Sequence, residues 1–249
     1  MPDIVLKCDD CRNVLPTIPD NSFKLAITSP PYNLNLRISS RKDGSVYYHS
    51  RQIIKEISTK YDGYADNLSL DEWYELNASV VTDLIRVADL TFYNVQMVAG
   101  NKPALLQLLG DFRDNIKDIV IWDKGHSQPA MRDGVMNSGW EFIIIFQRYP
   151  ESCKRRFTPA YFERGTVSNI WRIPPERGKK SDIYHGAVFP KKLVEYIITN
   201  FSTEGDWVID PFMGTGTAGV IAKQLNRNFY GIEFIESYFD YARSRIKDA

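Results

Sequence analysis

Short apolar runs alternate with segments of helical periodicity along almost the whole chain of 249 residues, and this alternation limits the fold more than any other feature. Each run has the length of one strand and is apolar at consecutive positions, which is typical of strands buried on both faces. We therefore expect an α/β fold with a twisted, mostly parallel sheet and helices on both faces. The expected strands, all taken as parallel, are 3–8, 23–28, 89–95, 118–123, 141–147, 206–210 and 228–233.

The clearest helical segment, residues 69–88, lies between two of these runs. It opens with Ser69 and has Glu72 three positions later, a pattern that predicts a capping box. Three further helices are expected at 189–201, 216–226 and 236–249.

Composition argues against several other classes of protein. Hydrophobic residues make up 43% of the chain and charged residues 25%, which is ordinary for a globular protein. No apolar run approaches the length of a membrane helix, about 20 residues. The N-terminus lacks the basic start and apolar core of a secretion signal, so we expect a cytoplasmic protein. The three cysteines cannot form a disulfide framework, no histidine stands at metal-site spacing from Cys8 and Cys11, and no metal is expected.

Charge is distributed unevenly, although the net charge is zero. Residues 148–192 contain eleven Lys and Arg against four Asp and Glu, with aromatic residues among them, and residues 37–60 contain six basic residues against two acidic ones. Such runs are commonly solvated surface, whereas interleaved aromatic residues favour nucleic acid. The stretches 33–67 and 148–184 also interrupt the alternation, and long loops in an α/β domain are usually functional.

The segment DWVIDPFMGTGTAGVIAKQLNRNFYGIE, residues 206–233, predicts a strand, a glycine loop, a helix and a second strand. Gly214 and Gly216 would let a bound molecule approach the backbone at a helix N-terminus. Asp210 ends the first strand, and Glu233 ends the second, where a carboxylate can accept from both hydroxyls of a ribose. The pattern predicts an adenosine-type cofactor, and NAD and S-adenosylmethionine both fit it. A glycine-rich turn without a ligand is the alternative.

The stretch TSPPYN follows the expected strand 23–28, at the carboxyl edge where α/β sheets bind ligands. Pro30 and Pro31 remove two backbone donors and fix φ, so we expect the carbonyl groups of this corner to be acceptors. Ser29 adds a hydroxyl and Tyr32 a ring face. Acceptors beside an aromatic plane suit the exocyclic amino group of a flat base, and a nicotinamide dehydrogenase has no use for them.

These motifs resemble those of the DNA amino-methyltransferases, which transfer a methyl group from S-adenosylmethionine to an exocyclic amino group of adenine or cytosine. The catalytic motif of that family is Asp, Asn or Ser followed by Pro-Pro-Tyr, here SPPY at 29–32, and its cofactor motif is similar to DPFMGTGT at 210–217. The order of the two motifs resembles the circularly permuted β group, over nearly the whole chain. The resemblance implies the Rossmann-like fold of S-adenosylmethionine-dependent methyltransferases.

The resemblance also implies the site residues. Ser29 and the Pro30 carbonyl would accept from the amino group of a base flipped out of the duplex, and Tyr32 would stack on it. Asp10, with Asp9 as the competing acid, would accept from the adenine of the cofactor. The catalytic residues are expected to be Ser29, Pro30, Pro31 and Tyr32. The residues expected to bind the cofactor are Asp10, Cys11, Phe189, Pro190, Asp210, Pro211, Phe212, Gly214, Gly216, Thr217, Glu233 and Phe234.

The same resemblance divides the chain. Residues 1–126, with an insert at 33–67, would form the catalytic part of the core, 127–184 the target-recognition region, and 185–249 the cofactor-binding part. The residues expected to contact DNA are Arg155, Arg156, Arg172 and Lys179. The tryptophans expected in the core are Trp73, Trp122, Trp140 and Trp207, whereas Trp171 remains a candidate for stacking on a base.

Two questions about the substrate and partners stay open. SPPY is typical of enzymes that methylate N4 of cytosine, which we favour, and N6 of adenine is the alternative. Double-stranded DNA is the expected partner, while a separately acting restriction endonuclease and a second copy of this chain are left open.

Overall fold

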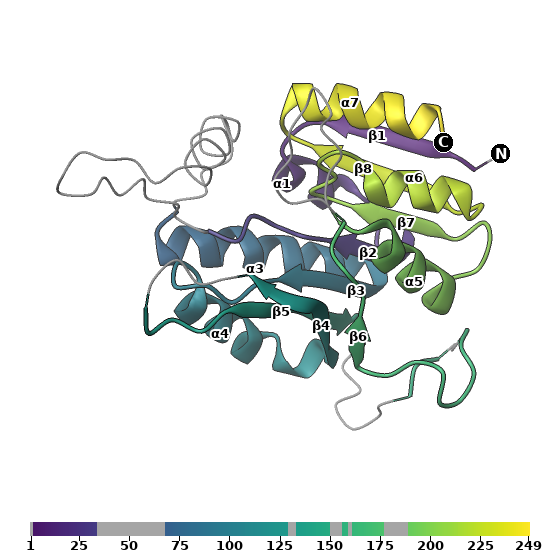
Figure 1. Cartoon of the computed structure of the whole chain (residues 1–249). Coiled ribbons are helices and arrows are strands. Elements are labelled where there is room, and N and C mark those ends of the chain that lie inside the picture. The colour runs from purple at the N-terminus through teal and green to yellow at the C-terminus, as the bar shows by residue number, and fades with distance from the viewer. Residues whose placement is uncertain (1, 34–67, 129–132, 150–155, 159–160, 177–188) are drawn as a thin grey trace, which may run out of the picture.

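The structure is a computed structural model that describes residues 2–33, 68–128, 133–149, 156–158, 161–176 and 189–249. Within these residues the strands form one eight-stranded sheet of order β1-β8-β7-β2-β3-β5-β4-β6 (Figure 1). The strands are β1 Ile4–Cys8, β2 Phe23–Thr28, β3 Ala88–Val95, β4 Ile116–Gln128, β5 Ser138–Gln147, β6 Ile170–Arg172, β7 Trp207–Asp210 and β8 Asn228–Glu233. The helices are α1 Cys11–Val14, α3 Leu70–Val87, α4 Lys102–Asp111, α5 Lys191–Phe201, α6 Thr217–Gln224 and α7 Glu236–Lys247, with the 3-10 turns η1 Leu15–Thr17 and η2 Arg113–Asn115.

Among the described strands, only β5 runs against the others. β1, β8, β7, β2 and β3 pair in parallel, β5 lies antiparallel between β3 and β4, and β6 is parallel to β4. The expectation of a parallel strand at 141–147 is therefore wrong. The connection 129–137 is shorter than the dozen or so residues that a parallel crossover needs, so β5 returns antiparallel to β4.

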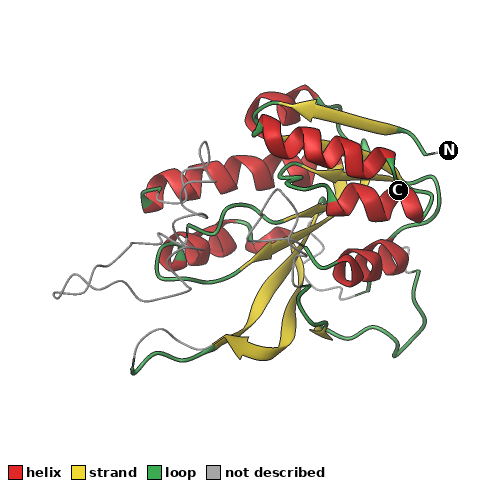
Figure 2. Ribbon diagram, turned by 45° about the horizontal axis from the view of Figure 1, so that its top comes forward, coloured by secondary structure: helices red, strands yellow, loops and turns green. Residues whose placement is uncertain are grey.

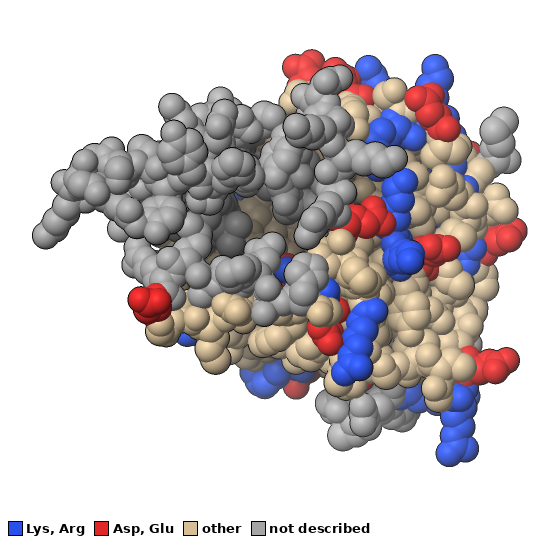
Figure 3. All heavy atoms as spheres, viewed as in Figure 1, with Lys and Arg blue, Asp and Glu red and all other residues tan. Residues whose placement is uncertain are grey.

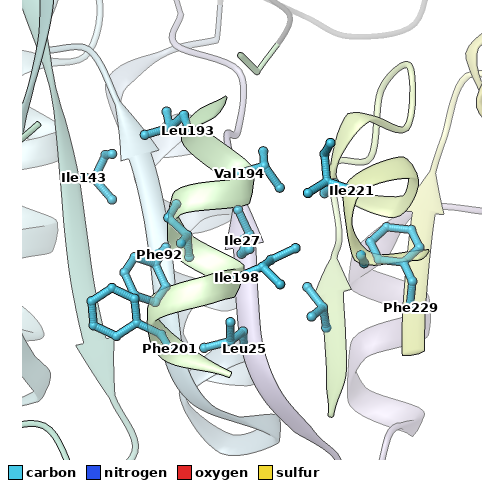
Figure 4. Close-up of a cluster of buried hydrophobic side chains, with 14 of the residues drawn as sticks. Leu25, Ile27, Phe92, Ile143, Leu193, Val194, Ile198, Phe201, Ile221 and Phe229 are labelled. Carbon is cyan, nitrogen blue, oxygen red and sulfur yellow. The ribbon is translucent and has the colours of Figure 1, made fainter. Parts of the chain in front are cut away.

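Helices cover both faces of this sheet (Figures 1 and 2). The buried residues of α5, α6 and α7 pack on one face, and those of α1, α3 and α4 on the other. Alternate side chains of β2 serve the two faces, because Leu25 and Ile27 pack with α5 whereas Ala26 packs with α3. Figure 4 shows the buried cluster on the face covered by α5, α6 and α7. The ring centroids of Phe92 and Phe201 lie 4.8 Å apart in this cluster.

The capping box predicted at Ser69 is confirmed as the start of α3. Ser69 caps α3, since its side chain accepts from the Glu72 N–H at 3.2 Å while the Glu72 carboxylate accepts from the Ser69 N–H at 2.8 Å. The helices α5, α6 and α7 lie within the three other expected segments. No helix in the described part of the chain is both long and apolar enough to cross a membrane.

The burial of two tryptophans, Trp140 and Trp171, differs from the expectation. Trp73, Trp122 and Trp171 are at most 5% exposed, whereas Trp140 is 44% exposed. Trp171 is therefore part of the core, where it stacks on Phe92 and not on a base. The expected burial of Trp140 is wrong, because it lies near the start of β5.

Candidate active site

Two neighbouring strands carry the catalytic and the cofactor motifs. β2 pairs in parallel with β7, with Leu25 opposite Val208 and Ala26 opposite Ile209. The corner that follows β2 and the glycine loop that follows β7 therefore leave the sheet side by side at its carboxyl edge, the edge at which α/β sheets bind ligands.

Side chains from β3 and β5 meet those of the corner that follows β2. The Ser29 hydroxyl donates to the hydroxyl oxygen of Tyr32 at 3.0 Å, and the Tyr32 hydroxyl donates to Glu141 Oε2 at 2.8 Å. The amide of Asn94 also donates to the Tyr32 oxygen. Burial of the phenol, and next the negative charge of Glu141, raise the pKa of Tyr32 well above its usual value. Tyr32 is therefore a neutral hydroxyl whose ring is held in one orientation.

The backbone of the corner is anchored from α3 and from the turn before α4. The buried indole N–H of Trp73 donates to the Pro31 carbonyl at 2.9 Å, and the Asn101 amide donates to the Tyr32 carbonyl at 2.8 Å. The Pro31 carbonyl is an acceptor as expected, but it faces the buried Trp73 indole and does not point outward. No described donor pairs with the carbonyl of Pro30. Ser29 and Pro30 keep acceptor capacity at this edge.

Asn33 closes the corner in a left-handed conformation, with φ of 59°. Its buried amide donates to the Leu68 carbonyl at 2.9 Å and to the Gly100 carbonyl at 2.8 Å. Residue 33, the first of the expected insert 33–67, is therefore joined directly to residue 68, and the rest of the insert, 34–67, lies outside the described residues. A Cβ at Gly100 would collide with the carbonyl oxygen of Asn33, so glycine is needed there.

Two buried carboxylates flank the glycine loop. Asp210 is 2% exposed, and its burial raises its pKa from 3.8 to about 7, although its Oδ1 accepts from the Phe212 N–H at 3.1 Å. Glu233 Oε2 accepts from the Gly214 N–H at 2.8 Å and its Oε1 from the Ile235 N–H at 2.9 Å. Burial raises the pKa of Glu233 as well, against these hydrogen bonds. A cation or a hydroxyl donor near these two groups would relieve the cost of burying them.

The glycines of the loop have two different roles. Gly214 and Gly216 have φ of 53° and 78°, which favour glycine. A Cβ at Gly216 would lie 2.9 Å from Ala242 Cβ, so this glycine also permits the close packing of α7 on the loop. At Gly219 a Cβ would meet the ring of Phe229 at 2.7 Å. Packing within the protein therefore explains both Gly216 and Gly219. The close approach of a bound molecule is not needed to explain either glycine.

Thr217, the first residue of α6, is 4% exposed, and its hydroxyl has no partner among the described atoms. A buried polar group is normally paired, so this one marks a place where a ligand atom can bind. It lies at a helix N-terminus, which favours negatively charged groups.

Residues 23–244 match the model of the N6/N4 DNA methyltransferase family, described as DNA methylase. The chain belongs to this family. The membership decides against the nicotinamide-dependent oxidoreductase that the glycine loop alone left open, and the protein is a DNA methyltransferase.

Two curated relatives of this methylase are bacterial enzymes. The type II methyltransferase M.HinfI of Haemophilus influenzae is 26% identical over 260 residues, which cover 96% of this chain and 67% of the relative. The orphan methyltransferase M.BamHII of Bacillus amyloliquefaciens is 44% identical over 90 residues, which cover 34% of each.

Solved structures show the same fold. The methylase is similar to the PvuII DNA methyltransferase (cytosine-N4-specific), with a TM-score of 0.70 and 17% identity over 98% of this chain and 88% of that one. It is also similar to a DNA modification methylase from Thermus thermophilus, complexed with S-adenosyl-L-methionine, with a TM-score of 0.62 and 22% identity over 99% of this chain and 95% of that one. The expected α/β methyltransferase fold is thereby confirmed.

At the far side of the methylase's cofactor loop, β1 brings Asp9 and Asp10 next to the end of β8. The Asp9 N–H donates to the Glu233 carbonyl at 3.1 Å. Asp10 pairs with the Arg12 guanidinium at 2.6 Å, which lowers the pKa of Asp10. Asp10 therefore lies at the expected edge, but Arg12 competes for its carboxylate. Burial raises the pKa of Cys11 to about 12, so its thiol stays protonated.

The other residues expected at the methylase's cofactor site lie on three segments. Phe234 follows β8 and is 48% exposed. Pro190 is buried and is the N-cap residue of α5, with Phe189 partly buried before it. Pro211 is buried, and the ring of Phe212 packs against the cluster of α1 and α3. Among the described residues, no group of three His, Cys, Asp or Glu is placed to hold a metal ion.

Of the four residues expected to bind DNA, the structure describes Arg156 and Arg172. Arg155 and Lys179 lie outside the described residues. Arg172 is exposed at the carboxyl end of β6, where it pairs with Asp123 at 3.2 Å. Arg156 is exposed beside Phe157, a ring that Lys117 approaches to 5.6 Å at the amino end of β4. Described basic and acidic side chains are interspersed on the face in Figure 3, and much of the basic run 148–192 lies outside the described residues.

Several residues that shape the methylase's site escaped the sequence analysis. The most important is Glu141, a single acid at the start of an otherwise apolar strand. Asn94 and Asn101 are also buried and polar. The sequence signal that could have identified such residues is a polar residue isolated in an apolar run, because a buried polar group needs a hydrogen-bond partner.

Proposed function

We propose that this methyltransferase transfers a methyl group from S-adenosylmethionine to the exocyclic amino group of a base flipped out of double-stranded DNA, with N4 of cytosine as the favoured target. The observation that carries the proposal is the pair of acceptors, the Ser29 hydroxyl and the Pro30 carbonyl. They lie at the end of β2, beside the glycine loop that follows β7.

The residues around that loop fit S-adenosylmethionine. Glu233 would accept from the ribose hydroxyls and Asp210 would face a cationic group. The α6 N-terminus, with the Thr217 hydroxyl that has no partner among the described atoms, would hold the carboxylate. When bound, this cofactor supplies an electrophilic methyl group on a sulfonium. The region around Asp10 and Phe234 would hold its adenine.

The corner would activate the base through acceptors alone. Ser29 and the Pro30 carbonyl accept the two N–H groups of the amino nitrogen, whose lone pair is otherwise delocalised into the ring. Accepting both would draw the nitrogen toward a tetrahedral shape, so that its lone pair is free to form the new N–CH3 bond while the bond between the methyl group and the sulfonium breaks. The neutral thioether would leave, and the methylated nitrogen would lose one of its protons to water. Holding the reactants in line contributes about 7 kcal/mol or more when they are well oriented. Tyr32, fixed by Glu141 and Asn94, supplies the ring against which the base stacks.

N6 of adenine is the second candidate, because the family includes enzymes of both kinds. Serine at position 29 favours cytosine, since SPPY is typical of cytosine enzymes in the resemblance described above. We propose that 127–184 recognises the DNA sequence. Its described part includes β5 and β6 of the main sheet, so base contacts would come from the segments between the strands.

The test uses a plasmid grown in cells that lack DNA methyltransferases, with tritiated S-adenosylmethionine. The DNA is digested to nucleosides, and we expect label in N4-methylcytosine; label in N6-methyladenine would establish the second candidate. Ser29→Ala should lower the transfer rate at least about a hundredfold, as for loss of a donor or acceptor at a reacting group.

Ser22→Ala, at the opposite end of β2, is the matched control and should transfer at the wild-type rate. Full activity of Ser29→Ala would show that the catalytic corner lies elsewhere.

A further inference from the structure

A buried ion pair lies directly behind the catalytic corner. Lys124 on β4 pairs with Glu141 on β5, and their side chains are only 13% and 7% exposed. Burying two charges costs free energy that their attraction often does not recover, so such a pair is weak evidence of stabilisation. Its position beside Tyr32 suggests another role.

The two oxygens of Glu141 have different partners. Oε1 faces the Lys124 ammonium, and Oε2 accepts from the Tyr32 hydroxyl at 2.8 Å and from the Asn94 amide at 2.7 Å. Lys124 thus fixes which oxygen is left for the corner. Neither member of the pair is needed for the acceptor role that the proposed function gives to Ser29 and Pro30.

The direction of every hydrogen bond in this network follows from its members. A carboxylate can only accept, so the one hydroxyl hydrogen of Tyr32 points to Glu141. The lone pairs of the Tyr32 oxygen then receive the Asn94 amide and the Ser29 hydroxyl, the latter at 3.0 Å. The one hydrogen of Ser29 is therefore directed toward Tyr32.

We propose that Glu141, held by Lys124, is a positioning residue for methyl transfer, which acts through Tyr32 to turn the lone pairs of the Ser29 hydroxyl toward the amino group. The inference rests on the proposed function. A Ser29 hydroxyl turned the other way would point its hydrogen at the amino group, where it would meet an N–H donor or occupy the lone pair needed for attack.

Glu141→Gln should reverse the direction of the hydrogen bonds that run between Glu141, Tyr32 and Ser29, with almost no change in the shape of the side chain. Because Lys124 donates, the amide oxygen of Gln would face it, and the NH2 group would face Tyr32. The Asn94 amide would lose the Glu141 oxygen as an acceptor and keep the Tyr32 oxygen, so both lone pairs of Tyr32 would be taken by amide donors. The Tyr32 hydroxyl would then donate to Ser29, whose hydrogen would point at the base. We expect the single-turnover rate on the plasmid to fall about tenfold or more, the scale of one misdirected hydrogen bond. The dissociation constant of S-adenosylmethionine, measured by calorimetry, should stay within about twofold of the wild type.

A rescue distinguishes this role from a general structural one. In Lys124→Met combined with Glu141→Gln, no ammonium fixes the amide, so Gln can turn its oxygen to Tyr32. We expect this double variant to be faster than Glu141→Gln alone, although it carries one more substitution. It also removes the unpaired buried charge, so it remains testable if Glu141→Gln fails to fold.

A double-mutant cycle with Tyr32→Phe gives the second test. Tyr32→Phe keeps the ring but removes the hydroxyl that links Glu141 to Ser29. Glu141→Gln should therefore have no further effect on the rate in the Tyr32→Phe background. Asp89→Asn, which breaks the pairs of Asp89 with Lys24 and Arg148 at the other end of β3, is the control and should keep the wild-type rate.

Three outcomes would overturn the inference: an unchanged rate in Glu141→Gln, a double variant with Lys124→Met that is no faster, or multiplying effects of Glu141→Gln and Tyr32→Phe. Failure of the wild-type protein to label the plasmid would instead reject the proposed function.

Discussion

The indole N–H of Trp73 donates to the carbonyl oxygen of Pro31 at 2.9 Å. Trp73 is fully buried on α3, the helix that Asn33 also reaches through its bond to Leu68 just before the Ser69 cap. One helix on one face of the sheet therefore fixes the backbone of the proposed catalytic corner from behind.

Trp73→Phe is expected to lower the free energy of unfolding by about 1–3 kcal/mol, because it leaves the Pro31 carbonyl without its donor and reduces the volume of a buried ring. Methyl transfer should slow as well, since the corner loses an anchor. Urea unfolding and single-turnover rates measure the two effects. Trp207→Phe, a partly buried ring that packs edge-on to Phe23, is the control for the rate. Equal rates in the two variants would show that the anchor is dispensable.

Gly100→Ala and Gly110→Ala should act in opposite directions. At Gly100 the added methyl group would collide with the Asn33 carbonyl oxygen, a backbone atom of the corner, so we expect loss of both stability and methyl transfer. At Gly110, in α4, nothing lies within 4 Å of the new Cβ, and alanine should stabilise the helix by up to about 1 kcal/mol. Thermal unfolding compares the two variants. An active, stable Gly100→Ala protein would contradict the close packing of Gly100 on Asn33.

Asp210 should make stability depend on pH. Its pKa is about 7 in the folded protein and 3.8 as its ordinary value, so the folded state binds this proton more tightly than the unfolded chain. The contribution of Asp210 to the free energy of unfolding is therefore full below about pH 4, falls as the pH rises to about 7, and is level above. The loss is up to about 4 kcal/mol.

Asp210→Asn removes this pH dependence, because Asn resembles the protonated acid at every pH. Relative to the wild type, the variant should gain more stability at pH 8 than at pH 5, as measured by urea unfolding at the two pH values. Parallel pH profiles of the two proteins would argue against the raised pKa of Asp210.

Glu233→Gln tests the assignment of the ribose. An amide has one acceptor oxygen where the carboxylate has two, and the Gly214 and Ile235 N–H groups already use both oxygens. We expect the dissociation constant of S-adenosylmethionine to rise about tenfold, the loss of one hydrogen bond to a charged group. Glu236→Gln, an exposed acid in the first turn of α7, is the matched control. Calorimetry that gives equal affinities for both variants would place the ribose elsewhere.

The sequence predicted those parts of the fold that local chemistry decides. The capping box at Ser69 and the glycine loop before α6 are local patterns, and both appear where expected. The direction of β5 was missed, since an apolar run has the same pattern in a parallel and an antiparallel strand; only the short connection from β4 carried the information.

The candidate site was predictable in its motifs but not in its support. TSPPYN indicated the acceptors, yet the partners of Pro31 and Tyr32 come from Trp73, Asn101 and Glu141, between 42 and 109 residues away along the chain. Such contacts depend on packing between elements, which no local pattern in a single sequence encodes.

The pairing of β2 with β7 has a consequence for how this enzyme could be altered. Both reactants would be held at the ends of adjacent strands of one sheet, so in the described part of the chain no hinge separates the two strands. The residues that set the reaction geometry and the segments that select the DNA sequence would then be separate parts of the protein. Exchanging the segments between the strands of 127–184 for those of another family member should redirect the enzyme to a new DNA sequence while the rate of the chemical step stays the same.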